Sequence, residues 1–302
     1  MEYELIIIRY AEIALKSKET RKRFENILLT NIKNVLESKN FKFIIRKEWG
    51  RIYIYTDQIT KCISYLQKIF GIKSISPALQ TESKIELISK LAVSISNEIL
   101  NKDKSFAVRA TRTGDHDFSS QDIAIKIGDA VVKATNAKVN LNNPDIELFI
   151  EIRNKKAFIF TRKIYCVGGL PFGSQGNVLA LIDGPASILA SWYLMRRGCK
   201  TIFINRKKSN EKILNSFIKN WFVSSKIFTI ISDDQYYKIK NIFNEMNCYA
   251  IVTGHNLDRN PLKILDDIKR LKNFYNVPIL HPLIAMKENE INNKCEEIGI
   301  IV

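Results

Sequence analysis

The sequence predicts two small α+β units followed by an α/β domain with a parallel sheet. Short apolar strands, amphipathic helices and hairpins alternate over the first 165 residues, and a dense run of turn-forming residues follows at 168–177. Beyond it, buried-type strands alternate with helices. A length of 302 residues, with 46% hydrophobic and 26% charged side chains, is sufficient for two or three packed domains and excludes a fully disordered chain.

The first unit, residues 1–60, is predicted to form a strand, a helix and a β-hairpin. Leu5–Ile8 is a short β-branched apolar strand. A helix follows, because apolar residues recur at helical spacing at Phe24, Ile27, Leu28, Ile32, Val35 and Leu36. Phe41–Ile45 and Arg51–Tyr55 are expected as strands joined through Trp49-Gly50.

The second unit, residues 61–165, begins with a helix that we expect to stop at Gly71, a residue suited to a helix C-terminus. Ser119 to Asp122 has the pattern of a helix start. The further expected elements are a helix over 83–100, a strand over 105–112, a helix over 119–133 and a hairpin of 146–152 with 157–161.

The third unit, residues 174–302, has the rhythm of a parallel sheet. Short buried-type strands are expected at 178–182, 201–205, 227–231 and 250–253, with helical segments between them. This alternation is Rossmann-like in the broad sense.

The charge balance favours a polyanionic partner. Lys and Arg number 47 against 31 Asp and Glu, so the formal net charge is +16. Cationic surfaces bind nucleic acid with release of counterions, which makes nucleic acid the default expectation. The alternative is compositional, because Lys, Ile and Asn are abundant together, as drift toward A/T-rich codons would produce.

Several classes of protein are disfavoured. No stretch approaches the roughly 18 consecutive apolar residues of a spanning helix, and Met1-Glu2-Tyr3-Glu4 lacks the basic start of a signal peptide. We therefore expect a cytoplasmic protein with no membrane partner. Five scattered cysteines without a C-x-x-C pair and three histidines without H-x-x-x-H spacing argue against disulfide frameworks and metal sites.

Three separate segments resemble one family. The segment Ile8–Lys18 with Arg23-Phe24-Glu25, the junction Gly168–Pro171, and the pair Tyr249–Gly254 and Val277–Ile284 are similar to the tRNA 4-thiouridine synthetases, or tRNA sulfurtransferases. The resemblance implies a ferredoxin-like domain over 1–60 and a THUMP RNA-binding domain over 61–165. It also implies an α/β Rossmann-like parallel-sheet domain of the PP-loop ATP pyrophosphatase type over 174–302.

The resemblance further implies a tRNA partner, held by the first two domains, while the PP-loop domain adenylates a uridine before sulfur replaces its oxygen. The cations that we expect to contact RNA phosphates are Arg9, Lys16, Lys18, Arg21, Arg23, Arg109, Arg112 and Lys126, with Lys22 beside them. Tyr10 and Trp49 are candidates for base stacking, with core packing as the alternative for both.

The loop after the strand at 178–182 departs from the family. The family carries Ser-Gly-Gly-x-Asp-Ser, whose backbone N–H groups cradle pyrophosphate, whereas this chain reads Asp183-Gly184-Pro185-Ala186-Ser187. Pro185 has no N–H, and Asp183 brings a negative charge to the place of phosphate. Ser187 matches the final Ser. The alternative is an ordinary helix start with Asp183 as N-cap and Pro185 in the first turn.

Two further departures concern the later part of the domain. Where the family has a Gly-Glu-Ser-Leu-Gly-Gln type segment, residues 254–261 retain only Gly254 and Leu257, and His255 is a candidate general base or phosphate contact, or an ordinary loop residue. The family's persulfide cysteine would lie beyond Val302, so we expect neither a counterpart nor a rhodanese-type domain. Cys248 and Cys295 are expected as buried apolar residues.

The leading hypothesis is a tRNA-binding protein of this family whose ATP loop and persulfide cysteine are lost, with no cofactor and no metal. The candidate residues of the degenerate ATP loop are Asp183, Gly184, Ser187, Gly254 and His255. One alternative is an active ATP-dependent tRNA sulfurtransferase that uses an external sulfur donor, with Asp183 holding magnesium. A third hypothesis is a non-catalytic homodimeric subunit that supports a separate catalytic partner.

Overall fold

The computed structural model describes residues 2–231, 235–258 and 260–300, so Arg259 and Val302 lie outside the described residues. The chain divides into two compact units. Unit 1 comprises Met1–Arg9, Glu37–Gln67 and Ser74–Cys166, and unit 2 comprises Tyr10–Leu36, Lys68–Lys73 and Val167–Val302. Each unit contains its own β-sheet.

The sheet of unit 1 is mostly antiparallel and has the order β2-β3-β1-β4-β8-β7-β5-β6, with β9 paired to β4. Its strands are β1 (Leu5–Arg9), β2 (Ile44–Glu48), β3 (Arg51–Tyr55), β4 (Ser74–Glu82), β5 (Ser105–Thr113), β6 (Lys138–Val139), β7 (Ile146–Arg153), β8 (Lys156–Phe160) and β9 (Ile164–Tyr165). Parallel pairing occurs where β5 lies between β6 and β7.

Strand β4 joins the two halves of this sheet. Its first part pairs antiparallel with β1, with Ala78 opposite Leu5, and its second part pairs antiparallel with β8, with Leu79 opposite Ile159. The strands expected for the ferredoxin-like and THUMP parts are therefore continuous through one shared strand.

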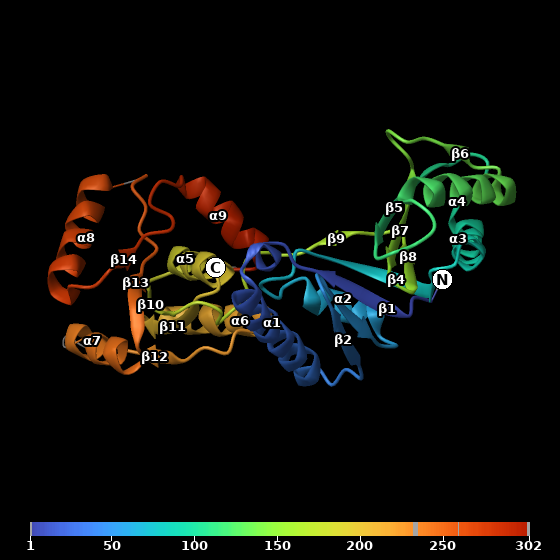
Figure 1. The fold of residues 1–302 in the computed structure, drawn as a ribbon. Helices are drawn as coiled ribbons and strands as arrows, with labels where there is room; N and C mark the ends of the chain where they lie inside the picture. Colours follow the sequence, from blue (N-terminus) through green and yellow to red (C-terminus); the bar gives the residue numbers. More distant parts are fainter. Residues whose placement is uncertain (1, 232–234, 259, 301–302) are drawn as a thin grey trace. The chain divides into compact units, whose positions relative to one another are not determined.

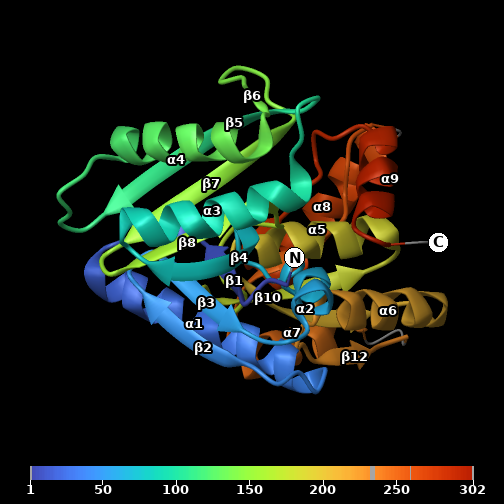
Figure 2. The ribbon, with the colours of Figure 1, turned by 90° about the vertical axis from the view of Figure 1, so that its right-hand side faces the viewer.

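The helices of unit 1 cover the half of the sheet that contains β5, β7 and β8. Helices α3 (Ile85–Ile99) and α4 (Ser120–Thr135) run side by side over these strands (Figure 2). Their buried residues are Ile88, Ala92 and Ile95 on α3 and Ile123, Ile127 and Val131 on α4. Ser119 and Asp122 form a capping box at the predicted start of α4. A short helix, α2, spans Ile59–Leu66.

The sheet of unit 2 is parallel, as the sequence predicts. Its strands are β10 (Asn177–Ile182), β11 (Lys200–Asn205), β12 (Ile227–Thr229), β13 (Cys248–Val252) and β14 (Ile279–Leu280), in the order β12-β11-β10-β13-β14. Strands β11 and β12 lie on one side of β10, and the later strands β13 and β14 lie on its other side. The strand order therefore changes direction between β10 and β13.

Helices cover both faces of this sheet. Helices α5 (Pro185–Arg196), α6 (Glu211–Trp221) and α9 (Glu288–Glu297) pack on one face, and α7 (Gln235–Glu245) and α8 (Pro261–Tyr275) pack on the other (Figure 1). A short turn of helix, η2, spans Lys208–Asn210, and unit 2 also contains η1 (Glu12–Leu15) and most of α1 (Lys18–Ser38). Both faces of β10 are thus apolar, which explains its uninterrupted hydrophobic sequence.

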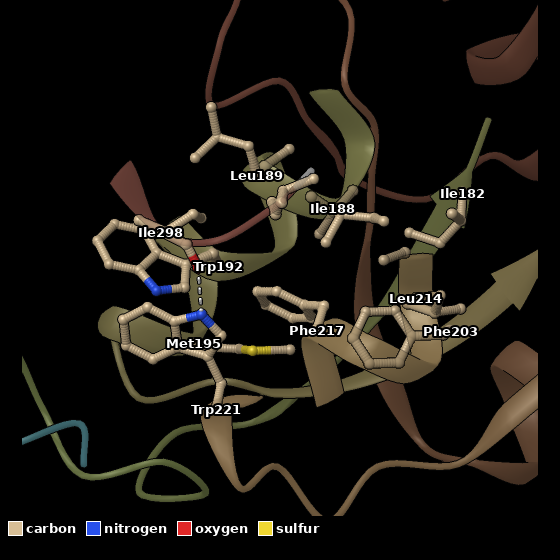
Figure 3. Close-up of a cluster of buried hydrophobic side chains, with 14 of the residues drawn as sticks. Ile182, Ile188, Leu189, Trp192, Met195, Phe203, Leu214, Phe217, Trp221 and Ile298 are labelled. Atoms are coloured by element: carbon tan, nitrogen blue, oxygen red, sulfur yellow. Dashed lines mark hydrogen bonds between the residues drawn. The ribbon is translucent and has the colours of Figure 1, made fainter. Parts of the chain in front are cut away.

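Aromatic side chains fill the core on the face covered by α5 and α6 (Figure 3). Trp221 at the end of α6 donates an indole hydrogen bond to the backbone oxygen of Ile298, at 3.0 Å. Phe70, from the short segment 68–73, stacks on Trp221 with ring centroids 5.3 Å apart and meets the edge of Trp192. This cluster fixes the helices that flank β10.

The structure corrects some expected elements. The helix near residue 61 ends at Leu66 rather than Gly71; Gly71 has φ +100° and lies in a turn, where a Cβ atom would approach Pro171 to 3.1 Å. Strand β2 starts at Ile44 instead of Phe41. Strands β4, β6 and β9 do not follow from the sequence pattern. Among the described residues, no helix is long and apolar enough to cross a membrane.

Candidate functional site

Two backbone donors of the loop between β10 and α5 are bound within the loop itself. The backbone N–H groups of Asp183 and Gly184 both donate to the Ser187 hydroxyl oxygen, at 3.0 and 3.2 Å. The same hydroxyl donates to the backbone oxygen of Gly184 at 2.6 Å. Gly184, and not Asp183 as expected, is the N-cap of α5, and Pro185 occupies the first turn as predicted. Ser187 thus caps this helix.

Asp183 is held by an ion pair. Its carboxylate lies 3.2 Å from the guanidinium of Arg206, which follows β11. The Asp183 side chain is about half exposed, at 46%, whereas that of Arg206 is 25% exposed. The cation that Arg206 brings to this loop is therefore bound to a carboxylate of the loop itself.

Gly254, directly after β13, packs against the first turn of α5. A Cβ atom at this position would lie 2.4 Å from the backbone nitrogen of Ser187 and 2.7 Å from the backbone carbon of Ala186. Such separations are far below van der Waals contact, so only glycine fits. The structure thus brings together three predicted residues, Gly184, Ser187 and Gly254.

His255 stacks on His281, with ring centroids 5.5 Å apart and planes at 19°. Burial lowers the pKa of both imidazoles, although Asp267 and Asp183 act in the opposite direction on His255. The Nδ1 atom of His281 lies 2.6 Å from the Thr253 hydroxyl, whereas Nδ1 of His255 is buried and has no hydrogen-bond partner among the described residues. Both rings are thus favoured in the neutral form at neutral pH.

A cavity of about 320 Å³ lies at the carboxyl edge of the sheet. It is lined by Pro185, Ala186, Gly254, His255, Asn256, Asn260, Ile264, Glu288, Ile291 and Asn292. Pro185 and Ala186 follow β10, and Gly254–Asn256 follow β13. The cavity therefore lies where the strand order changes direction. This is the usual place for ligands in open parallel sheets.

The cations predicted at residues 16–23, at and before the start of α1, lie on the surface of unit 2. Lys16, Lys18 and Arg23 are exposed, and Arg21 is half-buried. Arg197, at the end of α5, forms an ion pair with Glu12 of η1 at 3.0 Å, which brings a further, largely exposed guanidinium to this surface. The sequence pattern does not single out Arg197, because its proximity to η1 is a tertiary contact.

Arg9 does not lie on the surface. Only 9% of it is exposed, and its guanidinium donates to Ser76 at 2.9 Å and to Glu151 at 3.0 Å. Arg51 also donates to Glu151, at 2.6 Å. Burial favours the neutral form of Glu151, yet the two arginines hold the pKa of its carboxyl below the ordinary value. Arg9 therefore has a place in a buried ion cluster between strands.

The three remaining predicted cations come from the part of unit 1 that contains β5 and α4. Arg109 is bound to Glu147 at 2.8 Å and to the backbone oxygen of Leu141 at 2.7 Å. Arg112 donates to the backbone oxygen of Gly114 at 3.2 Å, and Lys126 is exposed on α4. Alternation along β5 places Arg109 and Arg112 on opposite faces, so the structure does not gather them at one point.

The two aromatic candidates differ. Tyr10 is buried and donates to the carboxylate of Glu25, which confirms the core-packing alternative for this residue. Trp49 is 65% exposed at the turn between β2 and β3. Arg153 donates to its backbone oxygen, and Arg51 donates to the backbone oxygen of Gly50 at 2.7 Å, so the turn is fixed while the indole remains on the surface.

The thiols are poor nucleophiles. Burial raises the pKa of Cys62, Cys248 and Cys295 to about 11 and that of Cys166 to about 12, and it also raises the pKa of Cys199. Cys248 and Cys295 are buried, as predicted. Within the described ranges, no group of three His, Cys, Asp or Glu side chains is arranged to hold a metal ion.

The fold defines the class of protein. N-terminal strands of ferredoxin-like and THUMP type are followed by a parallel-sheet domain whose loop meets a helix N-terminus. Residues 5–76 match the ThiI ferredoxin-like domain, residues 82–162 match the THUMP domain, and residues 207–301 match the family described as thiamine biosynthesis protein (ThiI).

Known proteins identify the family. The chain is 32% identical to a probable tRNA sulfurtransferase of Methanobrevibacter smithii, over 99% of this chain and 87% of that protein. It is 35% identical to one of Methanocaldococcus jannaschii, over 97% and 87% of the two chains. The chain belongs to the tRNA sulfurtransferase family.

Solved structures agree in fold. The Pyrococcus horikoshii protein PH1313 superposes with a TM-score of 0.83 at 29% identity, over 98% of this chain and 99% of that chain. A 4-thiouridine synthetase, solved as an RNA complex with bound ATP, has a TM-score of 0.83 at 24% identity, over 99% and 86% of the two chains. The latter likeness establishes the fold alone.

Proposed function

We propose that this chain binds tRNA and does not carry out ATP-dependent sulfur transfer by itself. The family relatives named tRNA sulfurtransferases, the THUMP match and the RNA complex of a structural neighbour support a tRNA partner. The role within thiolation is to hold the tRNA, with any sulfur chemistry supplied by a separate protein.

The proposal that this chain does not use ATP rests on one observation: the Ser187 hydroxyl binds backbone N–H groups at the N-terminus of α5. A pyrophosphate-binding loop needs free backbone N–H groups aimed at the anion. Here the N–H groups of Asp183 and Gly184 are bound to the Ser187 hydroxyl, and Pro185 has none to offer. The Ser187 hydroxyl thus occupies two donors that a phosphate would need, which supports the proposal that this loop does not hold ATP.

The surroundings of the loop support the same conclusion. Asp183 would repel phosphate, and Arg206, which could attract phosphate, is paired with it. The five thiols, with raised pKa values, give little thiolate at neutral pH.

We propose that each unit offers exposed side chains to RNA. On unit 2 these are Lys16, Lys18, Lys22, Arg23 and Arg197. On unit 1 they are Arg112, Lys126 and the indole of Trp49. Phosphate contacts of Lys and Arg give affinity without sequence preference, and an exposed indole adds stacking on an unpaired base. Arg9 is left out because it is buried.

The test uses two titrations of the full-length chain. Fluorescence anisotropy with labelled tRNA should show binding that weakens steeply between about 50 and 200 mM salt, since several phosphates are contacted. Calorimetry with ATP and magnesium should show no heat of binding. Stoichiometric ATP binding would instead support the active sulfurtransferase, with Asp183 released from Arg206 to hold magnesium. Absence of tRNA binding at low salt would contradict the proposal.

The third possibility, a dimeric non-catalytic subunit, is separated by a pull-down with and without nuclease. A protein partner that remains after nuclease treatment indicates direct contact. A partner that disappears on nuclease treatment indicates bridging by RNA, which is the outcome that the proposed tRNA-binding function predicts.

A further inference from the structure

The turn that carries the exposed indole of Trp49 is held from inside unit 1. Trp49 and Gly50 form the tip of the β2–β3 hairpin, between Glu48 and Arg51, which face each other in the strand register. Gly50 has φ +74°, a left-handed conformation that suits glycine. Water can satisfy the peptide oxygens of an exposed turn, so protein donors are not required there.

Two arginines nevertheless bind both peptide oxygens of the turn. The guanidinium of Arg153, on β7, donates to the backbone oxygen of Trp49, 104 residues away along the chain. The guanidinium of Arg51 donates to the backbone oxygen of Gly50 at 2.7 Å. Hydrogen bonds from a charged donor are stronger than those between neutral groups. The turn is therefore anchored at two points, and the anchor from Arg153 comes from a strand outside the hairpin.

Glu151 orients both arginines. Its carboxylate accepts from Nε of Arg51 at 2.6 Å and lies 3.5 Å from a terminal nitrogen of Arg153. The same carboxylate accepts from Arg9 at 3.0 Å. A second carboxylate, from Glu48, lies 3.9 Å from Nε of Arg153. Arg153 is 8% exposed, so a guanidinium held between these groups has little freedom to turn.

The burial of Arg153 carries a cost that stability alone does not explain. Its Nε is buried and has no hydrogen-bond partner within the described chain. Burying an ion and an unsatisfied donor costs free energy, and well-packed apolar residues often give equal or greater stability. Apolar residues cannot, however, bind a carbonyl oxygen in a defined direction. The effect specific to Arg153 is thus the placement of the Trp49 peptide.

Placement of this peptide bears on what the indole can do. Trp49 is 65% exposed, so its ring is accessible to a flat partner. An exposed indole stacks on an unpaired base of any identity. Groups that must be ordered on binding reduce the affinity, whereas a fixed backbone leaves only the two side-chain torsions of Trp to be ordered. A turn that is already fixed therefore favours stacking.

We propose that Arg153 is a positioning residue for RNA binding, which holds the Trp49 turn so that the indole is presented to an unpaired base before the RNA arrives. Arg153 acts through Trp49 and does not itself contact the RNA. This inference rests on the proposed tRNA-binding function, and it adds the buried residue that sets the geometry of the aromatic contact.

Arg153→Met and Ser76→Ala provide a matched comparison. Arg153→Met removes the donor to the Trp49 oxygen, while Glu151 keeps its two shorter contacts, with Arg9 and Arg51. Ser76→Ala removes a hydroxyl that Arg9 contacts in the same cluster, and this contact does not involve the turn. Fluorescence anisotropy with labelled tRNA should show an affinity about three- to tenfold lower for Arg153→Met and unchanged for Ser76→Ala.

A double-mutant cycle shows whether Arg153 acts through the indole. Arg153→Met should lower the affinity of the natural chain and have no further effect once Trp49 is replaced by alanine. Fluorine NMR of the full-length chain labelled with 5-fluorotryptophan gives a second readout. The chain has three tryptophans, and Trp49→Phe assigns the signal of Trp49. Arg153→Met should shift and narrow this signal, because the ring gains motion, and Ser76→Ala should leave it unchanged.

Four results would overturn the proposal: no loss of tRNA affinity in Arg153→Met, an equal loss with and without Trp49, an equal loss in Ser76→Ala, or an unchanged Trp49 signal in Arg153→Met. The first of these, with tRNA binding intact, would leave the proposed function standing. A natural chain that binds no tRNA would remove the proposed function, and the Trp49 signal would then decide the positioning role by itself.

Arg153→Lys covers the case in which Arg153→Met does not fold. Lysine keeps the charge that faces Glu151, but it lacks the planar fork with which a guanidinium binds two oxygens in fixed directions. The same loss of affinity, dependent on Trp49, and the same change in the Trp49 signal are expected for this variant.

Discussion

Gly254 meets Ser187 at a distance that leaves no room for a side chain, with 2.4 Å from an added Cβ atom to the Ser187 backbone nitrogen. We expect Gly254→Ala to push the loop after β13 away from α5 and to lower the free energy of unfolding of unit 2 by about 1–3 kcal/mol. Urea denaturation would measure this decrease in the free energy of unfolding. The control is Gly128→Ala on α4, where nothing lies within 4 Å of an added Cβ and alanine should stabilise the helix by about 0.5–1 kcal/mol. Equal effects of the two variants would contradict the predicted clash.

Glu151 is the counter-charge of buried Arg9 and of partly buried Arg51. Glu151→Gln removes the carboxylate that both guanidinium groups contact, and leaves the buried Arg9 without this counter-charge. We expect the unfolding free energy of unit 1 to fall by about 3–5 kcal/mol, measured by chemical denaturation. The control is Glu147→Gln. Glu147 pairs with Arg109 near the surface, so this variant should lower the unfolding free energy by about 1 kcal/mol or less. A small effect of Glu151→Gln would show that the cluster contributes little.

Glu151 also predicts a dependence on acid. Its pKa is lower in the folded protein than in the unfolded chain, so its ion pairs stabilise unit 1 above the unfolded pKa. That contribution disappears as the pH falls through the folded pKa. Denaturation curves measured below about pH 4.5, the ordinary value for Glu, should therefore show a steep decrease in stability for the natural chain and a shallower one for Glu151→Gln. Parallel slopes would contradict the assignment.

The two stacked histidines predict a separate transition at milder pH. The pKa values of His255 and His281 are lower in the folded protein, so the unfolded chain binds more protons as the pH falls through the ordinary histidine value. Unit 2 should lose stability between about pH 7 and pH 5.5. Replacing both residues, as in His255→Asn with His281→Asn, should flatten this part of the curve. Thermal melting across this range measures the effect, and His116→Asn in unit 1 is the control.

The lysines just before and within the first turns of α1 should set the salt dependence of tRNA binding. Replacing Lys16, Lys18 and Lys22 with Gln should reduce the slope of log affinity against log salt by about 1 for each phosphate that the variant no longer neutralises. The control replaces three exposed lysines of α7 and α8, namely Lys240, Lys263 and Lys269. An unchanged slope in the first variant would place the tRNA elsewhere on the protein.

Trp49 is the test of base stacking. We expect Trp49→Ala to weaken binding of tRNA by about 1–3 kcal/mol and Trp49→Phe to weaken it less, because the smaller ring still stacks. Binding of a blunt RNA duplex should change little in either variant. Fluorescence of the indole on titration with tRNA gives an independent measurement, and identical decreases in affinity for duplex and tRNA would contradict stacking.

The regular elements follow from local pattern, and the exceptions have physical causes. The strands of unit 2 are buried on both faces, so their apolar runs identify them. Strand β4 escapes prediction because Ser74, Ser76 and Pro77 interrupt its apolar pattern. Its central position comes from pairing with strands more than 60 residues away in either direction along the chain, and no local pattern contains such pairing.

In the candidate site, too, local features can be predicted from the sequence and tertiary contacts cannot. Pro185 in the first turn of α5 can be predicted from residue preference alone. The bonds from Asp183 and Gly184 to the Ser187 hydroxyl cannot, because they depend on a side-chain rotation. The prediction of Arg9 as a surface cation is wrong because its charge gives no sign of burial, and its partner Glu151 lies 142 residues away.

The shared strand β4 makes its two neighbours inseparable. A cut between Ala78, which faces β1, and Leu79, which faces β8, would separate Ser74 and Ile75 from their β9 partners Tyr165 and Ile164, and would leave an open strand edge on both fragments. Unpaired edges recruit other strands, so the fragments would aggregate rather than fold apart. Recombination between related genes would also have to exchange the segments on both sides of β4 together, because exchanging one segment alone would replace half of a strand.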